Sequence, residues 1–472
     1  MKINIVNDFI GGIGVPNGIN YEVVDSEKYP LDFYRPINTA FDYFYDKGYF
    51  ISMTDGQIIN FIPHHKHSTC NVVDFGEYVN EREKIYLYPI KISTQFNDVL
   101  GNNVKSNTLK SIFDFISVKA LKLFHKENFY LYIEHTWEGE FDRKTFEKLY
   151  YYANYYNIPA DKILIVVNTY NYVELHTKFL EIFPKEKKIK FCLHDACFLG
   201  KIDDYYGNCF NLNSFVDDNF LNENKPREKK ALLLNRRLRL HRLFILSLLL
   251  EDGLLDKTLS SFSMDDSLLG YDDLEGPLLQ RREQNIFVKE DYYIDKIVSG
   301  FNKLKTIHTQ TLDFDNIDGV LGLGHETKEL YEKTYFSIVT ETMFLDDFGF
   351  VSEKVFKPIL HLHPFVVLGS PNTLKHLKSY GFKTFDRWWD ESYDSEEHHG
   401  ERFKKIYEVI TTLLNKSDEE WVKMIGEMTE VLIYNKNHML SFGNMKETSN
   451  RIHTNLIKAI ENEDYTKNIR LF

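Results

Sequence analysis

Short apolar runs alternate along the first half of the chain with segments in which apolar side chains recur at helical spacing. The helical segments are 143–156 and 172–182. The short runs, which are typical of buried strands, are 3–6, 129–134, 162–168 and 188–193. An alternation of this kind predicts a parallel sheet covered by helices.

A second series of the same kind follows a polar segment at 222–230, where a new strand at 231–235 leads directly into a long helix. The later strands are 336–341 and 364–368, and helices are expected from Ser352, after 369–371 and from Arg402 onward. The stretch 263–330 is less regular and rich in acidic residues, and the two interpretations of it are a lid and an excursion that contacts the acceptor.

Chain length supports a division into two α/β domains, because 472 residues exceed what one hydrophobic core ordinarily holds. We expect a first Rossmann-like domain at residues 1–225 and a second at 226–440. A C-terminal helix within 441–472 is expected to pack back toward the first domain. With 43% apolar and 27% charged residues, the chain can bury cores of this size.

Charge and cysteine content narrow the class of protein. The formal net charge of -13 argues against a protein held to nucleic acid by overall charge, although it leaves room for a local basic groove. The four cysteines form no CxxC pair, and residues 1–6 have the pattern of a strand and not of a signal peptide. No apolar run is long enough to span a bilayer, so we expect a cytoplasmic protein without a membrane span.

The segment that follows the strand at 231–235 is rich in arginine. At helical spacing Arg236, Arg239 and Arg242 share one face, while Leu240, Phe244 and Leu248 share another that can be buried. Guanidinium groups at the carboxyl end of a parallel strand suit a diphosphate, because they bind phosphate oxygens bidentately. The structural alternative is a solvated basic face on an ordinary helix.

A second candidate is the tripeptide Ser352-Glu353-Lys354. Ser352 is a natural N-cap, Glu353 can accept hydrogen bonds from vicinal hydroxyl groups, and Lys354 can neutralise a phosphate at the positive end of the helix. Taken alone, the tripeptide is better explained as a helix cap, with Glu353 and Lys357 as a surface pair. Pro358 predicts a kink or an early end of this helix.

Three segments taken together, 336–342, 350–354 and 363–371, resemble the donor-site signature of family 10 glycosyltransferases, the α-1,3/4-fucosyltransferases. The order and spacing agree with that family's Phe-Glu-Asn-Ser, Tyr-Val-Thr-Glu-Lys and apolar strand ending near Gly-Ser/Ala-Pro. The similarity covers about residues 230–385, a third of the chain. The chain is also similar to glycosyltransferases encoded by bacteriophages, some of which glycosylate hydroxymethylated DNA bases. The aromatic and acidic run 385–394 contributes to that second likeness.

The resemblance implies a GT-B enzyme with two Rossmann-like lobes and a cleft between them, using a nucleotide sugar without a bound metal. Glu353 is then expected near the ribose or the sugar, and Lys354 and Arg242 near the phosphates. The donor-binding candidates are Asn235, Arg236, Arg239, Arg242, Thr340, Glu341, Ser352, Glu353 and Lys354. Thr340 and Thr342 stand where the family has Phe and Asn beside Glu341, so both a UDP-sugar and a GDP-sugar remain candidate co-substrates.

A catalytic base is expected in the first domain, on a carboxylate or histidine at the carboxyl end of a strand. The segment after the run 129–134 offers Glu138 as first choice, with Glu134 and His135 as alternatives. An acidic side chain on a surface loop is the structural explanation for Glu138.

Two further patterns carry weaker signals. The turn containing Gly11, Gly12 and Gly14 lacks the full dinucleotide fingerprint and is expected to admit a sugar close to backbone N–H groups. The group His64, His65 and His67 lacks a cysteine or carboxylate at ligand spacing, so we expect a polar loop and no metal.

The function expected from these observations is transfer of a sugar from a nucleotide-diphosphate donor to an acceptor hydroxyl, with no bound cofactor. The acceptor is a glycan or a hydroxymethylated DNA base of a phage, and in the second case the enzyme acts in the host cytoplasm. The alternative is a binding module for carbohydrate or nucleotide that keeps the fold without turnover.

Overall fold

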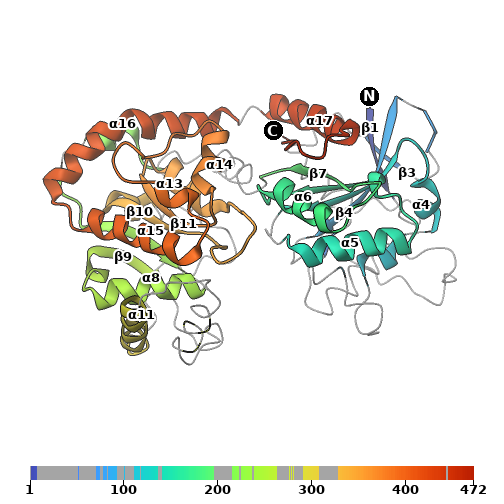
Figure 1. The fold of residues 1–472 in the computed structure, drawn as a ribbon. Helices are drawn as coiled ribbons and strands as arrows, with labels where there is room; N and C mark the ends of the chain where they lie inside the picture. Colours follow the sequence, from blue (N-terminus) through green and yellow to red (C-terminus); the bar gives the residue numbers. More distant parts are fainter. Residues whose placement is uncertain are drawn as a thin grey trace, which may run out of the picture. The chain divides into compact units, whose positions relative to one another are not determined.

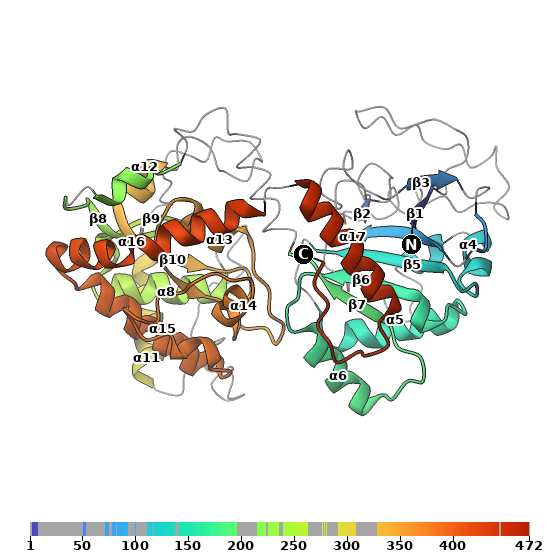
Figure 2. The same cartoon turned by 90° about the horizontal axis from the view of Figure 1, so that it is seen from above.

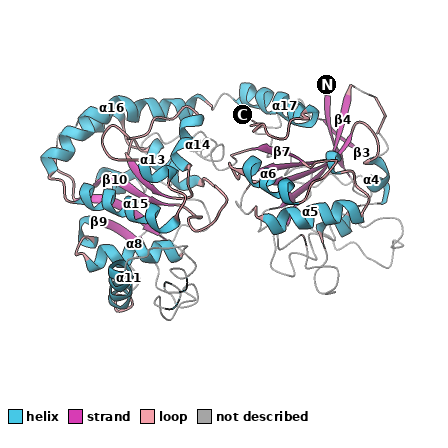
Figure 3. Ribbon diagram, viewed as in Figure 1, coloured by secondary structure: helices cyan, strands magenta, loops and turns pink. Residues whose placement is uncertain are grey.

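The structure is a computed structural model that divides into two compact units, Met1–Leu199 with Asn444–Phe472, and Gly200–Gly443 (Figure 1). In both, helices alternate with the strands of a mainly parallel sheet (Figure 3). Among the described residues no helix has the length and apolarity needed to cross a membrane. The described residues are 2–7, 51–52, 71–74, 78–81, 83–92, 100, 111–116, 118–136, 141–195, 215–222, 225–235, 239–262, 276, 278, 280, 291–307, 328–442 and 445–471.

The described strands of the first unit form one sheet in the order β3-β1-β4-β5-β6-β7, with β2 antiparallel to β4 and all other pairs parallel. These strands are β1 (Lys2–Asn7), β2 (Ile51–Ser52), β3 (Asn71–Asp74), β4 (Lys84–Ile92), β5 (Phe129–His135), β6 (Ile163–Val167) and β7 (Lys190–Leu193). Strand β6 is apolar and buried along its whole length, as expected for a parallel strand that is covered on both faces.

Helices cover both faces of this sheet. Helix α5 (Arg143–Tyr155) begins at a capping box made by Asp142 and Thr145, and α17 (Met445–Glu461) lies on the opposite face, against β7 (Figures 1 and 2). After α17 the chain returns to β7, where Leu471 N donates to Leu193 O. The remaining helical elements are η3 (Ile112–Phe115), α4 (Val118–Leu123), η4 (Ala160–Lys162) and α6 (Tyr172–Ile182).

The described strands of the second unit form a parallel sheet in the order β11-β10-β8-β9. They are β8 (Lys229–Asn235), β9 (Thr258–Phe262), β10 (Thr334–Thr340) and β11 (Phe365–Leu368). Its helical elements are η6 (Asp218–Asn222), α8 (Leu240–Glu251), η7 (Leu255–Lys257), α11 (Asp291–Leu304), α12 (Lys328–Glu332), α13 (Glu353–Leu360), α14 (Thr373–Ser379), η8 (Ser392–Ser395), α15 (His399–Leu414) and α16 (Asp418–Ser441).

Two of these helices contain features singled out in the sequence. Helix α13 ends at Leu360, two residues after Pro358, which is buried within it. Helix α11 forms inside the less regular stretch 263–330 and packs against α8, where a Cβ added to Gly300 would lie 2.0 Å from Ser247 O. The glycine is therefore what allows the two helices to approach so closely.

The division between the units falls after Leu199, earlier than the boundary expected after residue 225. The reason is visible around η6: Phe215 packs on His361 with ring centroids 5.3 Å apart, and Lys436 on α16 donates to Val216 O. Residues that precede the predicted boundary are thus held by side chains of the second unit.

His361, at the end of α13, is a buried histidine held only by ring packing. Its ring stacks on Tyr331 with centroids 4.2 Å apart, and among the described residues neither ring nitrogen has a hydrogen-bond partner. Burial, with the charges of Lys436, Lys357 and Lys328, lowers the pKa of His361 to about 3. The ring is therefore neutral at pH 7.

Replacing His361 by Phe keeps the stacked ring and removes the titrating group. Because the folded pKa of about 3 lies below the ordinary value of 6.5, the unfolded chain binds an extra proton below pH 6.5, and stability falls as the pH drops. Between about pH 7 and about pH 4.5, the unfolding free energy of the wild type should therefore fall by about 2 kcal/mol more than that of His361→Phe. Urea unfolding followed by tryptophan fluorescence measures this difference, since Trp388, Trp389 and Trp421 all belong to the second unit.

His125→Phe, at an exposed position, is the matched control and should leave the pH dependence unchanged. An acid sensitivity of His361→Phe equal to that of the wild type would contradict this account of His361.

Candidate functional site

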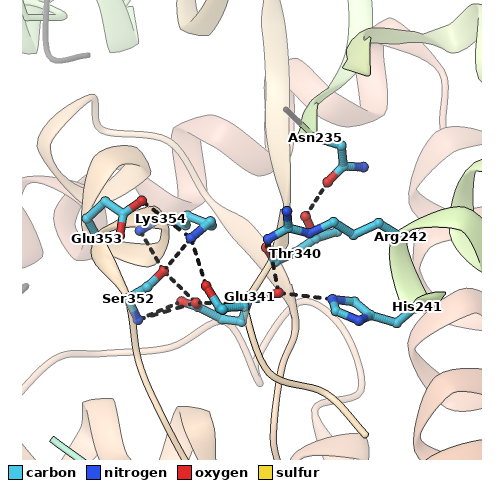
Figure 4. A network of polar contacts seen from close by, with 9 residues as sticks. Asn235, His241, Arg242, Thr340, Glu341, Ser352, Glu353 and Lys354 are labelled. Atoms are coloured by element: carbon cyan, nitrogen blue, oxygen red, sulfur yellow. Dashed lines mark hydrogen bonds and ion pairs between the residues drawn. The ribbon is translucent and has the colours of Figure 1, made fainter. Parts of the chain in front are cut away.

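The predicted donor-binding residues gather at the carboxyl end of the second sheet. Because β8 and β10 are parallel neighbours, with Ala231 opposite Phe336, Asn235 and Thr340 end the two strands side by side. Thr340 Oγ1 donates to Asn235 Oδ1, as Figure 4 shows. The carboxyl edge of a parallel sheet is where ligands of α/β proteins commonly bind.

The carboxylate of Glu341 lies completely buried just beyond β10. It accepts hydrogen bonds from Ser352 N at 3.2 and 3.3 Å, from Ser352 Oγ at 2.6 Å and from Thr342 N at 3.3 Å (Figure 4). Burial raises its pKa, and the charge of Lys354 and the bonds from Ser352 oppose that rise. Gly369 packs beside it: a Cβ there would meet Glu341 Cγ at 3.5 Å, an ordinary contact, and Thr373 Oγ1 at a tighter 3.0 Å.

Two side chains from the first turn of helix α8 form hydrogen bonds with the backbone carbonyl of Glu341. His241 Nε2 bonds to it at 2.9 Å, and the Arg242 guanidinium donates to it at 3.2 Å and to Thr340 O at 3.0 Å. Burial and the charge of Arg239 lower the pKa of Arg242 to about 10, so its guanidinium stays charged at pH 7. Burial and the Arg242 charge hold the pKa of His241 well below its usual value, so the imidazole is neutral.

Lys354 lies at the beginning of α13, and its side chain is bonded within the site. Its ammonium group donates to Ser352 Oγ at 3.0 Å, to Thr342 Oγ1 at 3.1 Å and to Glu353 Oε1 at 3.3 Å. Its backbone N–H donates to Ser352 Oγ, so Ser352 is the N-cap that the sequence predicts. The ammonium charge is thereby held at the positive end of the helix dipole.

Burial divides the described candidates into two groups. Glu353 and Lys354 retain 19% and 26% side-chain exposure, and Arg239 is exposed at the N-cap of α8. A buried framework supports them, consisting of Asn235, Arg242, Thr340, Glu341 and Ser352. A ligand from solvent therefore meets two cations and one carboxylate, an arrangement suited to an anionic group that also carries hydroxyls.

Sequence reasoning missed two members of this network. Thr342 was noted only as a departure from the family motif, yet its hydroxyl accepts from Lys354 and its N–H donates to Glu341. His241 lies within the arginine-rich segment but was not named as a candidate, and its burial makes it a neutral partner of a carbonyl. For Thr342 the available signal was its position next to Glu341, and for His241 it was its position next to Arg242.

The aromatic and acidic run 385–394 lies partly in the core of the second unit, while Asp386, Arg387 and Asp390 are exposed. Phe385 packs edge-on against Phe365 of β11, with centroids 5.2 Å apart. Glu391 accepts from Phe385 N and Thr384 Oγ1, and Asp394 accepts from Leu374 N and Lys375 N. Burial raises the pKa of both carboxyl groups. These contacts explain the buried members of the run by folding.

The two described candidates for the catalytic base, Glu134 and His135, lie at the end of β5 in the first unit. Both are buried; Glu134 accepts from Thr136 Oγ1, and His135 packs edge-on against Phe141 at 6.3 Å. Among the described residues no group of three His, Cys, Asp or Glu side chains is arranged to hold a metal ion. The candidates outside the described residues are Gly11, Gly12, Gly14, His64, His65, His67, Glu138 and Arg236.

Comparisons with known proteins leave the family open. No protein-family profile matches the chain, and no curated protein sequence matches it. Among solved structures, the chain is similar to the Candida albicans trehalose-6-phosphate phosphatase N-terminal domain, with 11% identity and a TM-score of 0.35 over 79% of this chain and 73% of that one. A likeness this weak carries no argument about fold or function.

The division into framework and accessible residues predicts opposite effects for two neighbouring carboxylates. Glu341→Ala leaves the buried N–H and hydroxyl of Ser352 without an acceptor, and we expect a loss of about 2 to 4 kcal/mol of unfolding free energy. Glu353→Ala removes a partly exposed helix-start charge and its pair with Lys354, and we expect a cost below about 1 kcal/mol. Denaturant unfolding of both variants measures the difference.

Glu341→Gln is the graded control, because its amide oxygen can still accept from Ser352, and it should fall between the other two. Equal stability losses for Glu341→Ala and Glu353→Ala would show that the Glu341 bonds do not support the site.

Proposed function

We propose that this chain is a metal-independent glycosyltransferase that moves a sugar from a nucleotide-diphosphate donor to an acceptor hydroxyl. The observation that carries the proposal is the placement of Arg239 at the start of α8 and of Glu353 and Lys354 at the start of α13, both at the carboxyl edge of one parallel sheet. The order of the segments 336–342, 350–354 and 363–371, which resembles that of family 10 glycosyltransferases, supports the same reaction.

In the proposed reaction the second unit stabilises the negative charge of the leaving group. The acceptor oxygen attacks the anomeric carbon, the bond from that carbon to the diphosphate oxygen breaks, and the diphosphate leaves with the electron pair. Lys354, Arg239 and the α13 N-terminus stabilise the departing anion, since fixed donors aimed at developing charge lower the barrier. Glu353 accepts hydrogen bonds from ribose or sugar hydroxyls.

In the proposed reaction a base in the first unit accepts the proton of the acceptor hydroxyl. Glu138 remains the first choice, with Glu134 and His135 as alternatives at the end of β5. A two-lobed GT-B arrangement and a cytoplasmic location belong to the same proposal. Its acceptor is a glycan or a hydroxymethylated DNA base.

Donor binding is the sharpest test of the second unit. The full chain is mixed with a panel of UDP- and GDP-sugars, and thermal unfolding and release of the nucleoside diphosphate are followed. We expect at least one donor to stabilise the chain, because a ligand that binds only the folded state raises its stability. Lys354→Met and Arg239→Gln should each weaken that donor about tenfold, the loss expected from one charge-assisted phosphate contact.

Lys333→Met is the matched control, since Lys333 is an exposed lysine just before β10, at the amino edge of the same sheet. It should bind the donor like the wild type. If no donor in the panel stabilises the chain or is consumed, the proposed function is wrong; if Lys333→Met and Lys354→Met behave alike, the donor binds elsewhere.

A further inference from the structure

The carboxyl edge of the first sheet carries a second group of polar side chains. Pairing of Glu134 with Val166 and of Val167 with Leu193 aligns the ends of β5, β6 and β7, so the residues that follow them lie side by side. All of these edge residues are buried, with at most 3% exposure: Glu134, His135, Thr136, Asn168, Thr169, His194 and Asp195. We call them the strand-end group.

The strand-end group is polar where the strands themselves are apolar. Strand β6 is Ile-Leu-Ile-Val-Val and is buried throughout, and Phe191 to Leu193 of β7 is apolar and buried as well. Hydrogen bonds join the strand ends, because Asn168 Nδ2 donates to Thr136 O at 2.5 Å and His194 N donates to Val167 O at 2.7 Å. Such burial of polar side chains is costly unless their hydrogen-bonding capacity is used.

Two buried asparagines of this sheet show the contrast between its edges. At the amino edge, Asn128 is fully used: Nδ2 donates to Val79 O, Glu81 O and Lys84 O, and Oδ1 accepts from Tyr78. At the carboxyl edge, no donor among the described residues reaches Asn168 Oδ1, although the residue is 1% exposed. A buried acceptor without a donor is costly, and a donor from a ligand recovers that cost.

The chemistry of the strand-end group selects hydroxyl groups over anions. The group itself contains two carboxylates and no lysine or arginine. Of the cations near it in the sheet, Lys91 of β4 is paired with Glu134 in the register, and Arg470 bridges Leu193 through its backbone while its charge acts on Tyr172. Burial lowers the pKa of His194 to about 4, against the opposing charge of Asp195, so this imidazole is neutral at pH 7. Carboxylate, amide and imidazole acceptors pair with hydroxyl donors.

We propose that the strand-end group binds the hydroxyl groups of a neutral polyol, that is, a sugar ring, with Asn168 Oδ1 accepting from one of them. Calling this sugar the acceptor rests on the proposed function; the binding site does not. The second unit presents Lys354 and Arg239 at the corresponding edge, which suits an anion, whereas the first unit presents acceptors for hydroxyls. A glycan is then favoured over DNA, whose phosphates need cations.

The experiment measures saturation-transfer NMR on the full chain with methyl α-D-glucopyranoside, methyl β-D-galactopyranoside and methyl α-D-mannopyranoside. DNA duplexes with and without 5-hydroxymethylcytosine are added separately. We expect at least one glycoside to bind, and Asn168→Ala to weaken it about tenfold, as the loss of one buried hydrogen bond does. Asp195→Asn, which keeps the side-chain shape, is the second variant in case Asn168→Ala does not fold.

Asn128→Ala is the matched control, because it removes the same amide from the opposite edge of the sheet. It should lower stability through its four lost hydrogen bonds and leave glycoside binding unchanged. Equal glycoside binding by Asn168→Ala, Asp195→Asn and wild type overturns the proposal. So does binding of hydroxymethylated DNA alone, lost in Asn168→Ala, because the ligand is then a nucleic acid.

Donor binding, measured in the same samples, separates this inference from the proposed function. If nucleotide sugars bind and no glycoside does, the strand-end site is wrong and the donor site stands. If glycosides bind through Asn168 and no nucleotide sugar binds, the strand-end site stands and the proposed transferase reaction is wrong.

Discussion

The buried carboxylate of Glu341 is the constraint on which the organisation of the second unit depends. It ties the end of β10 to the first turn of α13 through Ser352, and the carbonyl of the same residue receives His241 and Arg242 from α8. A carboxylate without these donors would be very costly at zero exposure. The three elements therefore have to come together for the residue to be buried at all, and their meeting places Lys354 and Glu353 at the sheet edge.

The two units use the same architecture with opposite chemistry. Each has a mainly parallel sheet whose strands end in polar residues, the position at which α/β proteins bind ligands. In the second unit the accessible residues include the cations Arg239 and Lys354, while the strand-end group of the first unit contains carboxylates, an amide and a neutral imidazole. The proposed transfer needs both kinds of group, cations for a charged leaving group and hydrogen-bond acceptors for a hydroxyl.

Local patterns predicted much of the candidate site. Ser352 was expected to cap α13, and it does, because side-chain capping depends only on neighbouring residues. The roles within the site did not follow from the sequence. Glu341 and Glu353 are both glutamates beside short polar residues, yet one is completely buried and the other is partly exposed, since burial depends on packing with β8, α8 and Gly369.

The sequence by itself determined the alternating strands and helices, most of their positions and the polar residues at the strand ends, because these depend on periodicity and short-range capping. Helix α11 and the boundary after Leu199 were decided by tertiary contacts, through Gly300 against α8 and Phe215 against His361. Tertiary structure alone also distinguished Asn128, with every hydrogen bond satisfied, from Asn168, whose Oδ1 meets no donor among the described residues. Hydrogen-bond satisfaction depends on partners distant in sequence, which local pattern cannot specify.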